Sequence, residues 1–418
     1  MKHNTGKTVT AILLSAILAG CTACGTDSPS SRENTDTSQI NAEVLQETAD
    51  ASQVTTETSP ESTDALPEST ENTGKDTVDV TSSPERVTIE GNSFYVDGRE
   101  IWFNGANTPW DNWNDFGGSF DAAFWDRHFT ELNDAGVNST RIWINCNGLV
   151  GVKINEDGSF GSVTDKHWED LDTLFSLAKE HKIYVMATLL SFDHFKNSNT
   201  GYQNWRNMIT DSDNIDSFVE GYVVPFVKRY DDNDYLYSID LMNEADWVYE
   251  NAECGKIPWE NISDYFARAA AGIHENSDIL VTSGLAMVKY HSDRFQGNKV
   301  SDEYLKSLSG NENSYLDFYS MHYYHWEKEW FGYPFDQTPA DYGLTDAKPC
   351  VIGECAAVDE GGVSLTNRYE QAFQNGWKGV YVWTSNGVDS CGGYDDMAPA
   401  TQNILTIAQD YVYPAGKE

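Results

Sequence analysis

The sequence predicts an α/β fold of the (β/α)8 TIM-barrel type over residues 86–418, and two observations lead to this prediction. Short apolar segments with strand character alternate with amphipathic stretches of helical periodicity, an order that places parallel strands inside a ring of helices. The first loop of this region, Asn104-Gly105-Ala106-Asn107, lacks the GxGxxG pattern of phosphate-cradling turns. That absence argues against the alternative fold, a doubly wound open sheet.

The expected elements follow one another in the order that a barrel requires. A hairpin is expected over residues 87–96, with its turn at Gly91-Asn92. The predicted strands are 101–104, 139–144, 183–188, 236–241, 279–282, 318–322, 350–353 and 380–383. The predicted helices are 121–134, 165–181, 213–230, 259–276, 365–375 and 400–411, with weaker patterns near 301–308 and 338–344.

Composition limits the classes of partner. The 418-residue chain has 27 Lys and Arg residues against 66 Asp and Glu residues, a formal net charge of −39. Such a charge repels phosphate backbones, so nucleic acid is not an expected partner. The 39% hydrophobic and 13% aromatic content excludes a chain that is disordered throughout. With 13 Trp, 22 Tyr and 18 Phe in so acidic a protein, we expect a neutral ligand that stacks on aromatic rings, such as carbohydrate.

Residues 1–20 have the features of a lipoprotein signal peptide. Lys2 and Lys7 supply positive charge before an apolar run at residues 11–19. This run is too short for a permanent membrane span. The run ends in Leu18-Ala19-Gly20-Cys21, which resembles the bacterial lipobox. The resemblance implies cleavage before Cys21, lipidation of its thiol and a location on the extracellular face of the bacterial cell membrane. The alternative is an ordinary signal peptide cut at a neighbouring small residue.

Residues 21–85 comprise this cysteine and a linker. The segment is rich in Ser, Thr and acidic residues and contains no Phe, Trp or Tyr. Such a composition cannot bury enough apolar surface to offset the entropy lost on ordering, so the linker is predicted to be disordered. We expect it to tether the barrel to the membrane, with the lipid as the only membrane contact.

Two glutamates directly follow or end predicted strands. Asn243-Glu244 follow the fourth strand, and Glu354 ends the seventh. Because barrel active sites lie at the carboxyl ends of the strands, the two carboxylates are expected to face each other about 5 Å apart, the spacing of retaining glycoside hydrolases. Either acid taken alone would also fit a helix cap or a solvated surface group. As a pair they need different surroundings, because one must be protonated and the other ionised.

Four neighbouring residues could provide those surroundings. Arg141 lies within the second strand and is expected to point into the barrel, where it would keep a carboxylate ionised. His322 and Tyr324, after the sixth strand, could hydrogen-bond the two acids. Trp383 ends the eighth strand and could be a platform for a sugar face. Each also has a structural alternative: Arg141 could be the partner of a buried acid, His322 a histidine of the core, and Trp383 a tryptophan of the core.

In this order and on these strands, Arg141, Asn243-Glu244, His322-x-Tyr324, Glu354 and Trp383 resemble glycoside hydrolase family 5 of clan A, over essentially all of residues 86–418. The resemblance implies that Glu244 is the acid/base and Glu354 the nucleophile of a double displacement that needs no cofactor. It also implies that Asn243 bonds the sugar 2-hydroxyl. The family has a histidine near the end of strand three, and the nearest match is His194, although it stands several residues past the strand.

Aromatic residues are concentrated in the predicted loops above the barrel. Trp110 and Trp113 lie among Asn and Asp residues in the first loop, and further aromatic residues follow strand three (Tyr202, Trp205) and strand six (Trp326, Trp330). About half of them are expected to line sugar subsites, which indicates an endo-acting enzyme on a β-1,4-linked plant polysaccharide. Mannan or glucomannan and cellulose-type β-glucan are the candidates, and the overall likeness of the loops favours mannan.

No metal site is predicted. Cys146, Cys254, Cys350, Cys355 and Cys391 lack CxxC or Cys/His zinc spacing, and their odd number implies at least one free thiol. We expect a monomer. Two other functions stay open: a non-catalytic carbohydrate-binding lipoprotein, and an exo-acting or transglycosylating relative on the same barrel. The binding protein would have no need of two opposed carboxylates at one point.

Overall fold

The structure is a computed structural model that describes residues 86–295 and 297–414. The predicted signal peptide, the predicted lipidation site Cys21 and the predicted disordered linker lie outside these residues. Within them, no helix is long and apolar enough to cross a bilayer.

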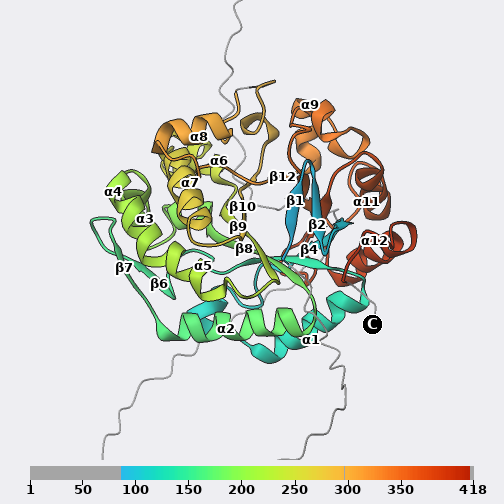
Figure 1. The fold of residues 1–418 in the computed structure, drawn as a ribbon, viewed down its shortest axis with the longest axis horizontal. Helices are drawn as coiled ribbons and strands as arrows, with labels where there is room; N and C mark the ends of the chain where they lie inside the picture. The colour runs from blue at the N-terminus through green and yellow to red at the C-terminus, as the bar shows by residue number, and fades with distance from the viewer. Residues whose placement is uncertain (1–85, 296, 415–418) are drawn as a thin grey trace, which may run out of the picture. The chain divides into compact units, whose positions relative to one another are not determined.

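A closed ring of parallel strands forms the centre of the described chain (Figure 1). Its strands are β4 (Phe103–Asn107), β5 (Ser139–Trp143), β8 (Tyr184–Ser191), β9 (Leu236–Asn243), β10 (Leu280–Thr282) with β11 (Gly284–Leu285), β12 (Tyr319–His322), β13 (Cys350–Ala356) and β14 (Gly379–Trp383). Only Ser283 separates β10 from β11, so these two segments act as the fifth strand. Because β10 pairs with β9 and β11 pairs with β12, the ring closes, which confirms the predicted (β/α)8 barrel.

Helices surround the strands in Figure 1. They are α1 (Ala122–Asp134), α2 (Asp165–Glu180), α3 (Tyr202–Ile209), α4 (Ser212–Phe218), α5 (Val224–Tyr230), α6 (Ala245–Glu250), α7 (Trp259–His274), α8 (Asp302–Ser309), α9 (Lys328–Phe331), α10 (Pro339–Tyr342), α11 (Leu365–Gln374) and α12 (Tyr394–Ile407). The helix expected over 213–230 is divided by a π-helical turn, Val219–Val223. The last helix begins earlier than expected and contains Pro399; Asp395 and Asp396 in its first turn favour that start electrostatically.

The amino end of the barrel is filled with aromatic side chains. The predicted hairpin is present as β1 (Thr88–Glu90) and β2 (Ser93–Val96), and β3 (Arg99–Ile101) adds a third strand. Phe94 of β2 packs edge-on against Phe103 and Phe318, with ring centroids 4.8 and 5.2 Å apart. Both partners lie at the start of barrel strands. The hairpin therefore covers this end, and the carboxyl ends of the strands are left for the polar residues described below.

Helix α1 shows how the outer layer is fixed. Asp121 caps it by accepting the N–H of Ala123 at 3.0 Å, which satisfies a backbone donor that has no partner inside the helix. Its inner face buries Trp125, Phe129 and Leu132 completely. Trp125 packs against Phe129 and Phe116, with ring centroids 5.7 and 5.9 Å away.

We predict that Trp125→Ala lowers the free energy of unfolding by about 3–5 kcal/mol, because it removes a fully buried ring and leaves a cavity. Urea denaturation followed by circular dichroism measures the change. Trp330→Ala is the control: Trp330 is 61% exposed, so its replacement should change the free energy by no more than about 0.5 kcal/mol. Equal effects of the two substitutions would contradict the packing described here.

Candidate active site

Arg141 joins three other strands from inside the barrel. It lies on β5 and is fully buried. Its guanidinium donates to Glu354 Oε1 on β13 at 2.8 Å, to Asn107 Oδ1 on β4 at 3.0 Å and to Asn243 Oδ1 on β9 at 2.6 Å. The inward orientation expected from the sequence is therefore present, and the charge lies beneath one of the two predicted acids.

Asp240 is the main charge partner of Arg141, and sequence reasoning assigned it no role. Its carboxylate is fully buried and accepts Arg141 Nε at 2.9 Å, Thr188 Oγ1 at 3.0 Å and the N–H of Gly284 at 2.9 Å. A buried guanidinium needs such a partner because its desolvation is costly. The sequence did contain a signal for this role. Asp240 lies in the middle of an apolar strand segment, where an acid cannot be a solvated surface group and needs a buried partner.

Glu244 stands at a tight corner between β9 and α6. Its φ of 48° is in the left-handed region, which few residues other than glycine adopt. Two sets of contacts hold the corner: Glu244 N–H donates to the carbonyl of Gly284 at 2.7 Å, and the buried Asp246 accepts the N–H groups of Ala286 and Met287 at 3.0 and 2.8 Å. The loop after β11 therefore sets where the Glu244 side chain projects.

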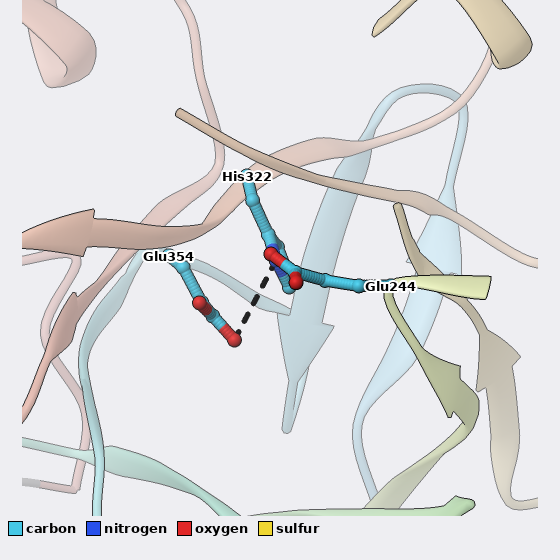
Figure 2. A group of neighbouring side chains, drawn as sticks. All are labelled: Glu244, His322 and Glu354. Atoms are coloured by element: carbon cyan, nitrogen blue, oxygen red, sulfur yellow. Dashed lines mark hydrogen bonds and ion pairs between the residues drawn. The ribbon is translucent and has the colours of Figure 1, made fainter. Parts of the chain in front are cut away.

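Glu244, His322 and Glu354 converge from three different strand ends (Figure 2). His322 Nδ1 lies 3.1 Å from Glu244 Oε1 and 3.5 Å from Glu354 Oε1. An oxygen of each carboxylate and a ring nitrogen of His322 all lie within 4.8 Å of one another. Carboxylate oxygens this close fit the spacing of retaining glycoside hydrolases, whose carboxyl groups are about 5–5.5 Å apart, better than the roughly 6.5–9.5 Å of inverting ones.

The two carboxyl groups differ in their neighbours. Burial raises the pKa of Glu244 to about 7, and Arg141 opposes that rise. Burial also raises the pKa of Glu354, whereas His322, Arg141 and the Tyr324 hydroxyl lower it. Arg141 and Tyr324 each donate to Glu354 at 2.8 Å. Glu244 instead has two uncharged partners, His322 Nδ1 at 3.1 Å and the Trp247 side chain, so the direct contact with the charged Arg141 favours the ionised form of Glu354 more strongly.

His322 is a neutral link between the acids. Burial lowers its pKa to about 4, so the imidazole carries no charge near neutral pH. A neutral ring with Nδ1 close to both carboxylates can donate one proton there without adding a second positive charge beside Arg141. Its position opposite Glu354 in the register of β12 and β13 places it between the two acids.

Tryptophans surround one side of the carboxyl ends. Trp110 packs against Trp113, Trp143 and Trp383, with ring centroids 4.6, 5.1 and 6.1 Å away. Trp383 is largely buried, whereas Trp113 is 40% exposed. Trp143, which sequence reasoning did not select, lies at the end of β5 and completes this group.

A second aromatic pair lies beside Glu244. Trp326 is 50% exposed, and its ring centroid is 6.4 Å from that of Trp247. Trp247 is in the first turn of α6, and its N–H donates to the Glu244 carbonyl at 3.0 Å. It had not been selected from the sequence, although it stands only three residues after the predicted acid.

The comparisons with known proteins agree with this geometry. No protein-family model matches the chain. A mannan endo-1,4-beta-mannosidase of Cryptopygus antarcticus is 25% identical over 336 residues, covering 73% of this chain and 86% of that protein. The solved beta-mannanase of the blue mussel Mytilus edulis matches with a TM-score of 0.71 at 20% identity, over 80% of this chain and 100% of the mussel protein. A family 5 mannosidase of Rhizomucor miehei matches with a TM-score of 0.50 at 13% identity, over 78% and 99%.

Together with the strand-end residues, the curated mannanase relative supports the resemblance to glycoside hydrolase family 5 that the sequence indicated. The solved structures are too dissimilar in sequence to show more than the barrel, so the roles of individual residues rest on the site itself.

His194, the nearest match to the family 5 histidine of strand three, is not joined to the acid pair by the contacts of the described chain. It is fully buried in the turn Phe192–Phe195, where its Nδ1 closes a cap with Ser191 at 3.1 Å. Trp205 packs edge-on against it, with centroids 4.6 Å apart. Trp205 is also buried and belongs to the core, so it is one of the loop aromatics that serve packing rather than a sugar subsite. Tyr202 lies under Arg206, 4.4 Å from its guanidinium.

Glu244, His322 and Glu354 could in principle bind a cation, since one ligand atom of each lies within 4.8 Å of the other two. The donor set does not favour one, because the Arg141 guanidinium already lies 2.8 Å from Glu354. A metal ion would meet that fixed positive charge. We therefore interpret the cluster as an acid/base pair. The described thiols of Cys146, Cys254, Cys350 and Cys355 are free and buried.

We predict that Gly284→Ala destabilises the protein by about 1–3 kcal/mol, because overpacking forces buried groups to move. A Cβ at this position would lie 2.6 Å from His322 Nε2 and 3.2 Å from an Arg141 nitrogen. Denaturant unfolding measures the effect. Gly201→Ala is the control, since its nearest neighbour would be 3.5 Å away. A Gly284→Ala variant as stable as the control would disagree with the packing of this site.

Proposed function

We propose that this protein is a retaining endo-β-1,4-mannanase that cleaves mannan or glucomannan by double displacement. The observation that carries the proposal is the close approach of the Glu244 and Glu354 carboxylates, within 4.8 Å, above the Arg141 guanidinium. The Cryptopygus relative is named a mannan endo-1,4-beta-mannosidase, which favours mannan over β-glucan as the substrate.

In the first step, Glu354 attacks the anomeric carbon of the sugar. A bond forms between that carbon and a Glu354 oxygen, and the bond to the glycosidic oxygen breaks. Glu244 transfers its proton to the departing oxygen, so the leaving sugar carries a neutral hydroxyl. The raised pKa of Glu244, about 7, keeps this proton available at neutral pH.

In the second step, the ionised Glu244 takes a proton from water, and the resulting hydroxide equivalent attacks the same carbon. The bond to Glu354 breaks and its carboxylate is restored. Two inversions at one carbon give net retention of configuration. Arg141 and Tyr324 stabilise the Glu354 carboxylate at the beginning and the end of the cycle, with donors 2.8 Å from its two oxygens.

The side chain of Asn243 is oriented to donate a hydrogen bond to the sugar. Its Oδ1 accepts from Arg141 at 2.6 Å, which leaves the amide nitrogen to donate. A donor at this strand end supports the expected contact with the 2-hydroxyl, which strengthens as charge develops at the neighbouring carbon.

The two tryptophan groups suit sugars on the two sides of the cleavage point. Trp247 and Trp326 lie on the side of Glu244, the proton donor to the leaving group. The Trp110, Trp113, Trp143 and Trp383 group comes from the ends of β4, β5 and β14, and we assign it to the sugars on the other side. Binding on both sides favours endo-cleavage. For the mature protein we keep lipid attachment at Cys21 and an extracellular, membrane-anchored location as part of the proposal, on the strength of the lipobox-like sequence.

We predict that Glu354→Gln and Glu244→Gln each lower kcat on mannan about a thousandfold or more, because each removes a group of the reaction. Assays on mannan, glucomannan, carboxymethylcellulose, xylan and mixed-linkage glucan measure activity and products. Mannan should give a spread of oligosaccharides, whose first-formed anomer is retained. Glu329→Gln, at an exposed position, is the control and should stay within about twofold of the wild type.

Saccharide binding without hydrolysis of any polymer in this panel would favour the carbohydrate-binding lipoprotein instead. A single short product released from chain ends would favour exo-action.

We predict that activity falls as pH rises through about 7, because Glu244 must be protonated in the first step. Asp193 raises the pKa of Glu244 and Lys196 lowers it. Asp193→Asn should therefore move the alkaline limb of the kcat/KM profile to lower pH, and Lys196→Gln should move it to higher pH. Shifts in the same direction, or none, would show that another group controls this limb.

A further inference from the structure

We propose that Glu327 is a positioning residue that holds Tyr324 against Glu354, and that it acts as an uncharged carboxylic acid. This inference rests on the proposed function, because it concerns how the Glu354 carboxylate is held for reaction.

The contacts of Glu327 fix the peptide groups of Tyr324. Glu327 Oε1 accepts the Tyr324 N–H at 3.1 Å, and the Glu327 N–H donates to the Tyr324 carbonyl at 2.9 Å. Both ends of the turn that contains His325–Glu327 are thereby tied together. Tyr324 in turn donates its hydroxyl to Glu354 Oε2 at 2.8 Å. A chain of direct contacts therefore runs from Glu327 to the carboxylate proposed as the nucleophile.

The same turn also carries Trp326. This residue stands directly before Glu327, half exposed and packed against Trp247. The turn thus presents Tyr324 to the nucleophile and Trp326 to the side of the leaving group. Of Tyr324, Trp326 and Glu327, only the side chain of Glu327 is fully buried. This burial fits a supporting residue rather than one that binds substrate.

The surroundings of Glu327 oppose a negative charge. In the described chain, no lysine, arginine or histidine lies within ion-pair distance of it, and its Oε2 is buried without a protein partner. The charged groups that act on it are acids: Asp246 on α6, Glu244 at the head of that helix, and Glu360.

The remaining neighbours do not change this balance. Arg368 pairs with Glu360 at 3.4 Å, and the hydroxyls of Tyr323 and Tyr342 are the other titratable groups near the carboxyl. An unpaired carboxylate in such a place would be strongly destabilising, so the carboxyl retains its proton. Burial accordingly raises the pKa of Glu327 well above its ordinary value.

Three variants test the inference on the full chain with mannan as substrate. Glu327→Gln retains an uncharged acceptor of the same shape, and its kcat should stay within about threefold of the wild type. Glu327→Ala leaves the Tyr324 N–H unpaired, and its kcat should fall about tenfold to a hundredfold with KM changed much less. Glu329→Gln, in the same loop but exposed, should match the wild type. Equal losses in the Gln and Ala variants would overturn the uncharged role.

A double variant tests whether Glu327 acts through Tyr324. Because the Tyr324 hydroxyl lowers the pKa of Glu354, both Tyr324→Phe and Glu327→Ala should move the acidic limb of the kcat/KM profile to higher pH. The double variant should lose no more activity than Tyr324→Phe alone. Multiplicative losses, or an acidic limb that stays in place in Glu327→Ala, would show that Glu327 supports the fold without positioning Tyr324.

A stability measurement keeps the charge state testable if the proposed function fails. A carboxyl whose pKa is raised in the folded state stabilises it below the unfolded pKa and loses that contribution as pH rises. The urea midpoint of Glu327→Gln should therefore rise relative to that of the wild type between about pH 5 and about pH 8. A difference that does not change with pH would overturn the uncharged state, whereas absent hydrolysis of mannan by the wild type would overturn the proposed function alone.

Discussion

The site depends on one buried positive charge. A guanidinium inside a barrel is tolerated only if its donors are paired in good geometry, because its desolvation costs several kcal/mol. Arg141 meets this requirement with acceptors from β4, β9 and β13. Each of these strands must therefore hold its register, since a shift by one residue would turn an acceptor out of the barrel. The fully buried Asp240 completes the pairing and in turn accepts the N–H of Gly284, the first residue of β11.

That pairing creates an asymmetry between two glutamates whose carboxylate oxygens lie within 4.8 Å of each other. Glu354 receives direct donors from Arg141 and Tyr324, whereas Glu244 sits on a left-handed corner held by backbone contacts and by Asp246. Burial acts on both carboxyl groups in the same direction. The division of roles therefore comes from the direct ion pair of Glu354 with Arg141 rather than from exposure, as different chemistry at two similar groups requires.

Buried acids recur behind the reacting pair. Asp246 fixes the position of Glu244 from the α6 side, and Glu327 ties down the turn of Tyr324 from the β12 side. Burial raises the pKa of Asp246 to about 7 and that of Glu327 further above its usual range. Burial thus disfavours the charged form of both supporting groups, which limits the repulsion they add to that between Glu244 and Glu354.

Much of this arrangement could be predicted from the sequence, for reasons that are local. Apolar strands alternating with helices identify the barrel because each element must bury one face, and the barrel topology places strand ends together. Glu244 and Glu354 could be selected because acids directly after apolar strands need a chemical explanation. Arg141 could be selected because a charge within such a strand needs a partner.

The tertiary structure alone decided which residues meet. Asp240 and Trp247 gained their roles from neighbours distant in the chain, and Trp205 is a packing residue because the loop after β8 folds it into the core. His194 likewise turns to its own cap. The sequence determines the chemical character of each position and its place along a strand. Whether a side chain points to solvent, to the core or to another carboxylate depends on packing between distant segments, which no local pattern encodes.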